Sequence, residues 1–226
     1  MSKNAVNRSY VFIVTYGRSG STTLQTLLQS IPGYHITGEN FNCLSALYSA
    51  VQLATTARFQ HGKNDHDAID PWFGANHIDP DQFGARLVRA FEDEIMRPPA
   101  DARVAGFKEI RFHEVGAENF ESFLNFMHQH FSPCKFVFNT RGWREIVRSG
   151  WWQNQRPERV EEIIRGADQM YHDYLTKYPE RGILLCHEQT REDPAAFQPL
   201  FEFLGEDFDL KKVSEIAGRR LGHSGV

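Results

Sequence analysis

The sequence begins with an apolar segment that leads directly into a loop of small residues. Residues 10–15 read Tyr-Val-Phe-Ile-Val-Thr, as in a buried strand, and the loop Tyr-Gly-Arg-Ser-Gly-Ser-Thr-Thr follows at 16–23. Glycines allow a backbone to turn tightly and to approach an anion closely. The N–H groups at the start of a following helix point at such an anion, and the helix dipole adds to the attraction. The segment therefore predicts a strand, a phosphate-binding loop and a helix.

This loop differs from the loop that binds nucleoside triphosphates, which reads G-x-x-x-x-G-K-[ST]. No lysine precedes its hydroxyl residues, and Arg18 stands early in the loop instead. We therefore expect it to hold an anion other than a Mg²⁺-bridged pair of β- and γ-phosphates.

The length of 226 residues and an apolar content of 41% predict one domain over residues 1–226 with a substantial core. The net charge of −4 argues against a dedicated nucleic-acid-binding protein. Cys43, Cys134 and Cys186 are widely spaced and form no C-x-x-C motif, as expected for buried small hydrophobic residues in a reducing compartment. Since no signal segment or membrane-spanning apolar run is present, we expect a cytoplasmic protein without integral membrane association. Its oligomeric state cannot be read from the sequence.

Strand-like and helix-like segments alternate along the chain. The other short apolar runs that predict strands are 34–37, 104–108, 135–139 and 183–187. The segments with helical patterns are 21–30, 41–58, 81–97, 117–131, 143–154, 158–178, 194–204 and 210–217. Alternation of this kind predicts an α/β fold, a P-loop-like three-layer sandwich around a parallel sheet of about five strands. Ligands of such sheets gather at the carboxyl ends of the strands.

A turn-rich excursion at residues 59–80 interrupts this alternation. Two interpretations remain open for it: a surface excursion held by Trp72 and Phe73, or a lid that faces the substrate.

Two further basic segments are candidate phosphate sites. Arg141 stands where the fourth strand is expected to end, and Ser149 follows eight residues later, within the predicted helix. Together they could supply a bidentate cation and a hydroxyl donor to a second phosphate; a solvated basic helix face is the alternative. Near the end of the chain, Arg219, Arg220 and Gly222 predict either a phosphate clamp or a frayed basic tail.

In this order, the motifs resemble those of the sulfotransferases that use 3′-phosphoadenosine-5′-phosphosulfate (PAPS). The loop at 16–22 is similar to that family's 5′-phosphosulfate loop, and Arg141 with Ser149 has the spacing of its 3′-phosphate pair. The segments 185–194 and 219–225 resemble two of its later motifs. The resemblance implies transfer of a sulfuryl group from PAPS to an acceptor hydroxyl, such as that of a carbohydrate or glycolipid, without a metal. The residues that it implies for nucleotide binding are Gly17, Arg18, Ser19, Gly20, Ser21, Thr22, Thr23, Arg141, Ser149, His187, Arg219, Arg220 and Gly222.

The catalytic residues are expected at the ends of the strands. Many cytosolic members of the family carry a histidine two residues after a strand-end lysine, but here Ile110 stands two residues after Lys108. The chain is closer to the shorter bacterial and carbohydrate-type members, in which a glutamate after the second strand serves as the base, and Glu39 occupies that place. Arg18 is expected to act on the charge that develops on the leaving phosphate, and Lys108 on the sulfuryl oxygens or the bridging oxygen. His113 is the reserve base.

Two other functions remain possible from the sequence. A nucleotide-dependent kinase should carry a loop lysine and a strand that ends in an aspartate for Mg²⁺, and neither is present. A non-catalytic nucleotide- or glycan-binding protein would keep the fold without the chemistry.

Overall fold

The computed structural model describes residues 8–218, and their contacts divide them into two compact units. Residues 42–97 form one unit, the helical unit, and the other described residues form the sheet unit. The sequence prediction of a single domain over residues 1–226 stays a prediction. Among residues 8–218, no helix combines the length and the apolar character needed to cross a membrane.

The sheet unit is built on five parallel strands, which confirms the predicted α/β fold class. The strands are β1 (Ser9–Val14), β2 (Tyr34–Thr37), β3 (Val104–Glu109), β4 (Cys134–Thr140) and β5 (Gly182–Cys186). Their order across the sheet is β2-β3-β1-β4-β5. The connections therefore run to one side of β1 first and to its other side afterwards. Such a reversal opens a crevice at the carboxyl end of the central strand, where ligands of these folds bind.

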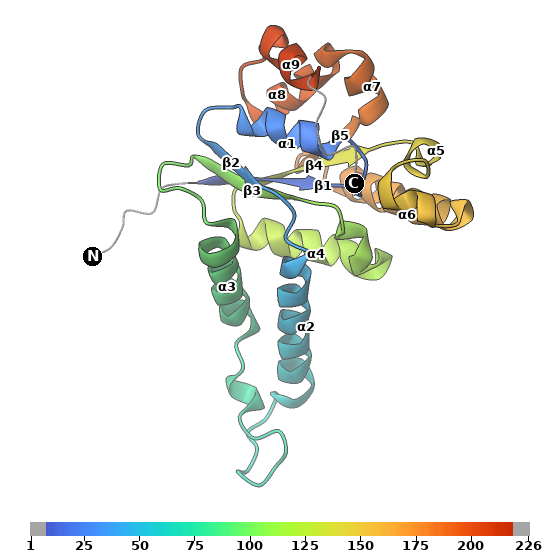
Figure 1. Cartoon of the computed structure of the whole chain (residues 1–226). Coiled ribbons are helices and arrows are strands. Elements are labelled where there is room, and N and C mark those ends of the chain that lie inside the picture. The colour runs from blue at the N-terminus through green and yellow to red at the C-terminus, as the bar shows by residue number, and fades with distance from the viewer. Residues whose placement is uncertain (1–7, 219–226) are drawn as a thin grey trace. The chain divides into compact units, whose positions relative to one another are not determined.

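Helices cover both faces of the sheet, as Figure 1 shows. The helices on one face are α1 (Ser21–Gln29), α8 (Gln198–Leu204) and α9 (Leu210–Ala217), and those on the other are α4 (Ala117–His130) and α6 (Pro157–Lys177). Side chains of a strand alternate between the two faces. Val11 and Ile13 of β1 accordingly belong to the core cluster that includes Leu24 of α1. Phe12 points the other way, where its ring lies 4.9 Å from that of Phe107.

Short helices follow the carboxyl ends of β3, β4 and β5. They are the 3-10 helix Phe112–Val115, α5 (Trp143–Ile146), the 3-10 helix Gly150–Asn154, α7 (His187–Glu192) and the 3-10 helix Pro194–Phe197. The predicted single helix over 143–154 is wrong, because the chain leaves helical geometry after Ile146. Ser149 has an extended backbone, and Gly150 has a φ of 57°.

The helical unit contains two longer helices that pack against each other. Its elements are α2 (Cys43–His61), the 3-10 helix Ala75–His77, α3 (Pro80–Phe91) and the π-helical turn Glu92–Met96. In the turn-rich stretch, the ring of Trp72 stacks on that of His61 at 3.6 Å, while Phe73 is exposed. The surface and lid interpretations of this stretch both stay predictions.

Candidate functional site

The loop after β1 is held rigidly from behind by buried polar side chains. The hydroxyl groups of Thr15 and Ser19 lie 2.7 Å apart, and Thr15 also donates to the carbonyl of Asn139 at 2.7 Å. The amide of Asn139 donates to the carbonyl of Ser19 at 2.8 Å, and the indole of Trp152 donates to the carbonyl of Gly17 at 3.1 Å. Because the carbonyls of Gly17 and Ser19 accept these hydrogen bonds, the loop has a fixed backbone conformation before the start of α1.

At two loop glycines an added side chain would meet a neighbouring ring. Gly20 has a φ of 80°, and a Cβ added there would lie 2.2 Å from Nδ1 of His187. A Cβ at Gly17 would lie 2.2 Å from the ring of Trp151. Aromatic rings from two other elements therefore lie directly on the loop backbone. Ser21, Thr22 and Thr23 form the first turn of α1, with Ser21 buried and Thr22 exposed.

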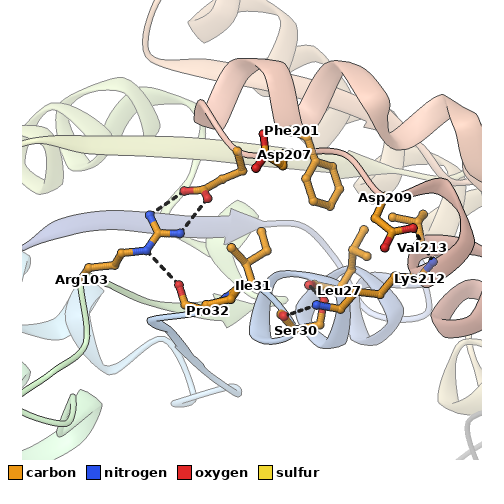
Figure 2. A pocket seen from close by; sticks show the side chains of 11 residues that line it. Leu27, Ser30, Ile31, Pro32, Arg103, Phe201, Asp207, Asp209, Lys212 and Val213 are labelled. Carbon is orange, nitrogen blue, oxygen red and sulfur yellow. Dashed lines mark hydrogen bonds and ion pairs between the residues drawn. The ribbon is translucent and has the colours of Figure 1, made fainter.

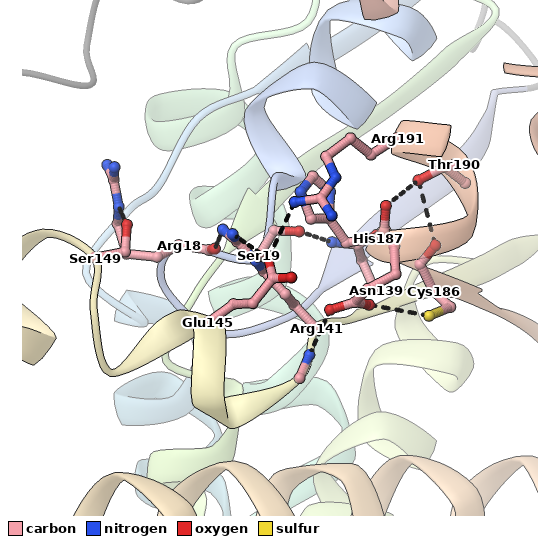
Figure 3. A network of polar contacts seen from close by, with 12 residues as sticks. Arg18, Ser19, Asn139, Arg141, Glu145, Ser149, Cys186, His187, Thr190 and Arg191 are labelled. Carbon is pink, nitrogen blue, oxygen red and sulfur yellow. Dashed lines mark hydrogen bonds and ion pairs between the residues drawn. The ribbon is translucent and has the colours of Figure 1, made fainter. Parts of the chain in front are cut away.

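Arg18 joins the loop to both residues of the predicted second phosphate site (Figure 3). Its backbone is left-handed, with a φ of 68°. Its Nε donates to Oγ of Ser149 at 2.8 Å, and its carbonyl accepts from Nη1 of Arg141 at 2.8 Å. Both predicted residues therefore contact the loop, but at opposite ends of Arg18.

The guanidinium of Arg141 is also paired with a carboxylate. Its Nη2 lies 2.7 Å from Oε2 of Glu145, one helical turn further along the chain. The same oxygen accepts from Nη1 of Arg191 on α7 at 3.0 Å. These hydrogen bonds, with that from Arg141 the largest effect, lower the pKa of the Glu145 carboxyl. Two cations from separate elements thus meet on one anion (Figure 3).

Tyr16 positions the start of the turn that carries Arg141. Its buried hydroxyl accepts from the backbone N–H of Arg141 at 2.8 Å and lies 2.8 Å from Oδ1 of Asp168 on α6, to which it donates. Burial raises the pKa of Asp168 to about 6. This contact fixes the distance between the loop and the end of β4.

Glu39 and Lys108 lie together at the ends of β2 and β3. Nζ of Lys108 is 2.6 Å from Oε1 of Glu39, and Nη1 of Arg111 is 3.6 Å from Oε2. Lys108 is buried, whereas the Glu39 side chain is 37% exposed. In the sheet, β3 lies between β2 and β1, so the expected position of Glu39 beside the loop stays a prediction.

His113 lines a cavity of about 570 Å³. Other residues that line it include Trp151, Trp152, Arg159 and Glu162. Since Trp151 also lies against Gly17, this cavity is next to the loop. Nδ1 of His113 is buried without a hydrogen-bond partner among the described residues.

The neutral state of His113 should appear in the pH dependence of stability. Burial, followed by the charge of Arg111, lowers the pKa of His113 from 6.5 to about 4. Between these pH values the unfolded chain binds more protons at this residue, so its contribution to the free energy of unfolding falls as pH falls from 6.5 toward 4. As the pH falls over this range, we expect the free energy of unfolding of wild type to fall by up to about 3 kcal/mol relative to that of His113→Gln. Urea unfolding measures this difference.

Comparing the two proteins at each pH cancels the opposite effect of Asp168, whose pKa is raised. A difference in unfolding free energy that stays constant from pH 7 to pH 4 would contradict a buried neutral imidazole.

His187 begins α7 instead of ending the fifth strand as predicted, because β5 ends at Cys186. Its ring lies on Gly20, and burial lowers its pKa. Arg219, Arg220 and Gly222 lie outside the described residues. Within residues 8–218, no three His, Cys, Asp or Glu side chains are grouped so that they could hold a metal ion.

A second cavity, of about 350 Å³, lies at the other end of the sheet unit (Figure 2). It is lined by Leu27 of α1, by Ser30 directly after that helix, and by Arg103, which directly precedes β3. Arg103 forms a bidentate ion pair with Glu206. None of the predicted site residues within the described chain lines this cavity.

The sequence analysis missed three residues that complete the site. Asn139, a polar residue in an apolar strand, was a readable signal for a contact to the loop. Arg191 follows His187 by four positions on α7, which places the two on the same helix face. Glu145 follows Arg141 by four positions, but Arg141 precedes α5. The meeting of Glu145 and Arg191 across two elements had no signal in the sequence.

Structural comparison finds similar folds in solved sulfotransferases. The sulfotransferase domain of the Synechococcus PCC 7002 olefin synthase matches with a TM-score of 0.57 and 16% identity, over 97% of this chain and 81% of that one. The sulfotransferase domain from the curacin biosynthetic pathway matches with a TM-score of 0.55 and 15% identity, over 94% and 79%. No protein-family model matches the sequence, and comparison with curated proteins finds no match. The chain therefore has the fold of the sulfotransferases, as the resemblance of its motifs predicted.

Proposed function

We propose that this protein is a cytoplasmic sulfotransferase that transfers a sulfuryl group from PAPS to an acceptor hydroxyl. One observation carries the proposal: the two candidate anion-binding elements, the glycine loop and the Arg141 guanidinium, are joined through Arg18 at the carboxyl end of the central strand. A nucleotide with phosphates at both its 5′ and 3′ positions matches two such elements. The sulfotransferase fold supports the same conclusion.

The residues present fit the nucleotide by two tests of the geometry. Side chains at Gly17 and Gly20 would clash with the rings of Trp151 and His187, so the loop stays free of side chains at these two positions. Arg141 already binds an anionic carboxylate, which a phosphate can replace. In the proposed complex, Gly17 to Thr23 hold the 5′ end, Arg141 and Ser149 hold the 3′ end, and the ring of His187 lies against the base.

PAPS supplies an activated sulfuryl group when bound. Glu39 would accept the proton of the acceptor hydroxyl as that oxygen forms a bond to sulfur and the bond from sulfur to the 5′-phosphate oxygen breaks. Lys108 and Arg18 would stabilise the charge that the departing phosphate gains, at roughly 3–4 kcal/mol for each preorganised donor. Rigid positioning by the loop contributes a further share, on the order of 7–11 kcal/mol in favourable cases.

The acceptor is proposed to bind in the cavity lined by His113 and Trp151. The position of the cavity supports this proposal, because Trp151 both lines the cavity and lies against Gly17 of the loop. The cavity is lined by the aromatic rings of Trp151 and Trp152 and by the charged side chains of Arg159 and Glu162. This lining suits a hydroxyl-rich molecule, such as a carbohydrate or the sugar of a glycolipid. Screening acceptors with radiolabelled donor would identify it, and His113 is the second candidate for the base.

Titration calorimetry without Mg²⁺ tests the proposal. We expect adenosine 3′,5′-bisphosphate to bind roughly ten- to a hundredfold more tightly than AMP, because charged hydrogen bonds to the 3′-phosphate contribute about 1.5–3 kcal/mol. Equal affinities would remove the 3′-phosphate site and the proposed function with it. Tighter binding of ATP than of the bisphosphate, strengthened by Mg²⁺, would favour the kinase alternative.

A further inference from the structure

Glu145 occupies the place where two guanidinium groups converge. Its Oε2 lies 2.7 Å from Nη2 and 3.2 Å from Nε of Arg141, and 3.0 Å from Nη1 of Arg191. Arg141 comes from the end of β4 and Arg191 from α7, so the pair spans two elements (Figure 3). The contact is an anion site that the protein fills with its own carboxylate.

The charges of this cluster allow an anion with more negative charge to displace the Glu145 carboxylate. One carboxylate carries a single negative charge against two guanidinium groups. A phosphate monoester carries about −1.5 to −2 at neutral pH and offers three acceptor oxygens. The Glu145 side chain is 40% exposed and belongs to the four-residue helix α5. It can therefore turn into water when another anion takes its place.

Ser149, the other residue that the motif resemblance implies for the 3′-phosphate, faces a different partner here. Its hydroxyl accepts from Nε of Arg18. Arg191 instead contacts the same carboxylate oxygen as Arg141. Four residues earlier on α7, the ring of His187 lies on Gly20 of the loop. This one helix therefore reaches both the glycine loop and the carboxylate that Arg141 binds.

We propose that Arg191 is a second cation for the 3′-phosphate of the nucleotide, and that Glu145 holds Arg191 and Arg141 together until the phosphate displaces it. The inference rests on the proposed function, since it concerns the 3′ end of the same nucleotide. It makes Arg191 a determinant of the choice between nucleotides with and without a 3′-phosphate. It also makes Glu145 a competitor of the ligand.

Calorimetric affinities of adenosine 3′,5′-bisphosphate and AMP for variants of the full chain test this inference. Arg191→Gln is expected to weaken bisphosphate binding roughly ten- to a hundredfold and to leave AMP binding unchanged. Arg191→Lys should keep part of the affinity, because it keeps the charge but loses the planar fork. Glu145→Gln is expected to strengthen bisphosphate binding severalfold, again without an effect on AMP.

Arg165→Gln serves as the control. Arg165→Gln removes an exposed arginine with a similar partner, Glu161 at 2.8 Å, and should change neither affinity. Unchanged bisphosphate binding in Arg191→Gln, or weaker binding in Glu145→Gln, would overturn the inference. If wild type itself does not prefer the bisphosphate over AMP, the proposed function fails instead. Thermal unfolding of each variant separates loss of a contact from loss of the fold.

Discussion

Replacing Gly20 with alanine is expected to lower the free energy of unfolding by about 2–5 kcal/mol and to weaken binding of adenosine 3′,5′-bisphosphate. A left-handed backbone costs an alanine about 1–2 kcal/mol. The new Cβ would also lie 2.2 Å from the ring of His187, and overpacking of this kind typically costs about 1–3 kcal/mol. The ring must leave the loop, and it then no longer supports the nucleotide. Urea unfolding and calorimetry measure the two effects.

Gly205 provides the matched control for this substitution. Its φ is 76°, but no atom would lie within 4 Å of an added Cβ. Gly205→Ala should therefore cost only the backbone part, about 1–2 kcal/mol. Gly20→Ala introduced into a His187→Ala background should cost the same, because the ring is gone. If Gly20→Ala is no more destabilising than Gly205→Ala, the ring does not lie on the loop in solution.

The sheet and the first loop could be predicted because their signals are local. Each predicted strand, such as 104–108 for Val104–Glu109, lies within one residue of the observed one at either end. In an α/β fold, a short apolar run between polar segments usually forms a buried strand of the central sheet. The positive φ of Gly20 likewise follows from a chain that must turn from a strand into a helix within a few residues.

The rest of the site depends on contacts between distant segments, and these leave no periodic pattern. The predicted helix over 143–154 ends early, and Ser149 lies in an extended stretch where it can reach Arg18. The pattern of residues 143–154 did not contain this partner, which is 131 residues away. The convergence of Arg141 and Arg191 on Glu145 similarly arises only when β4 and β5 become neighbours.

The pairing of Lys108 with Glu39 combines both kinds of information. Each residue was predicted from its place after a strand, but the order β2-β3-β1 brings them together. Lys108 is buried and thus needs an oxygen partner. Glu39 therefore has two roles that a substitution must separate: it accepts a hydrogen bond from Lys108, and in the proposed reaction it accepts a proton.

Glu39→Gln makes that separation, because the amide oxygen still accepts from Lys108 while the amide cannot serve as a base. We expect turnover to fall roughly 10²–10⁴-fold, the usual contribution of a general base, with bisphosphate affinity near that of wild type. Radiolabelled sulfuryl transfer and calorimetry measure the two quantities. Glu161→Gln removes an exposed carboxylate paired with Arg165 and should leave both unchanged. Survival of turnover in Glu39→Gln, together with its loss in His113→Gln, would move the role of base to the imidazole in the neighbouring cavity.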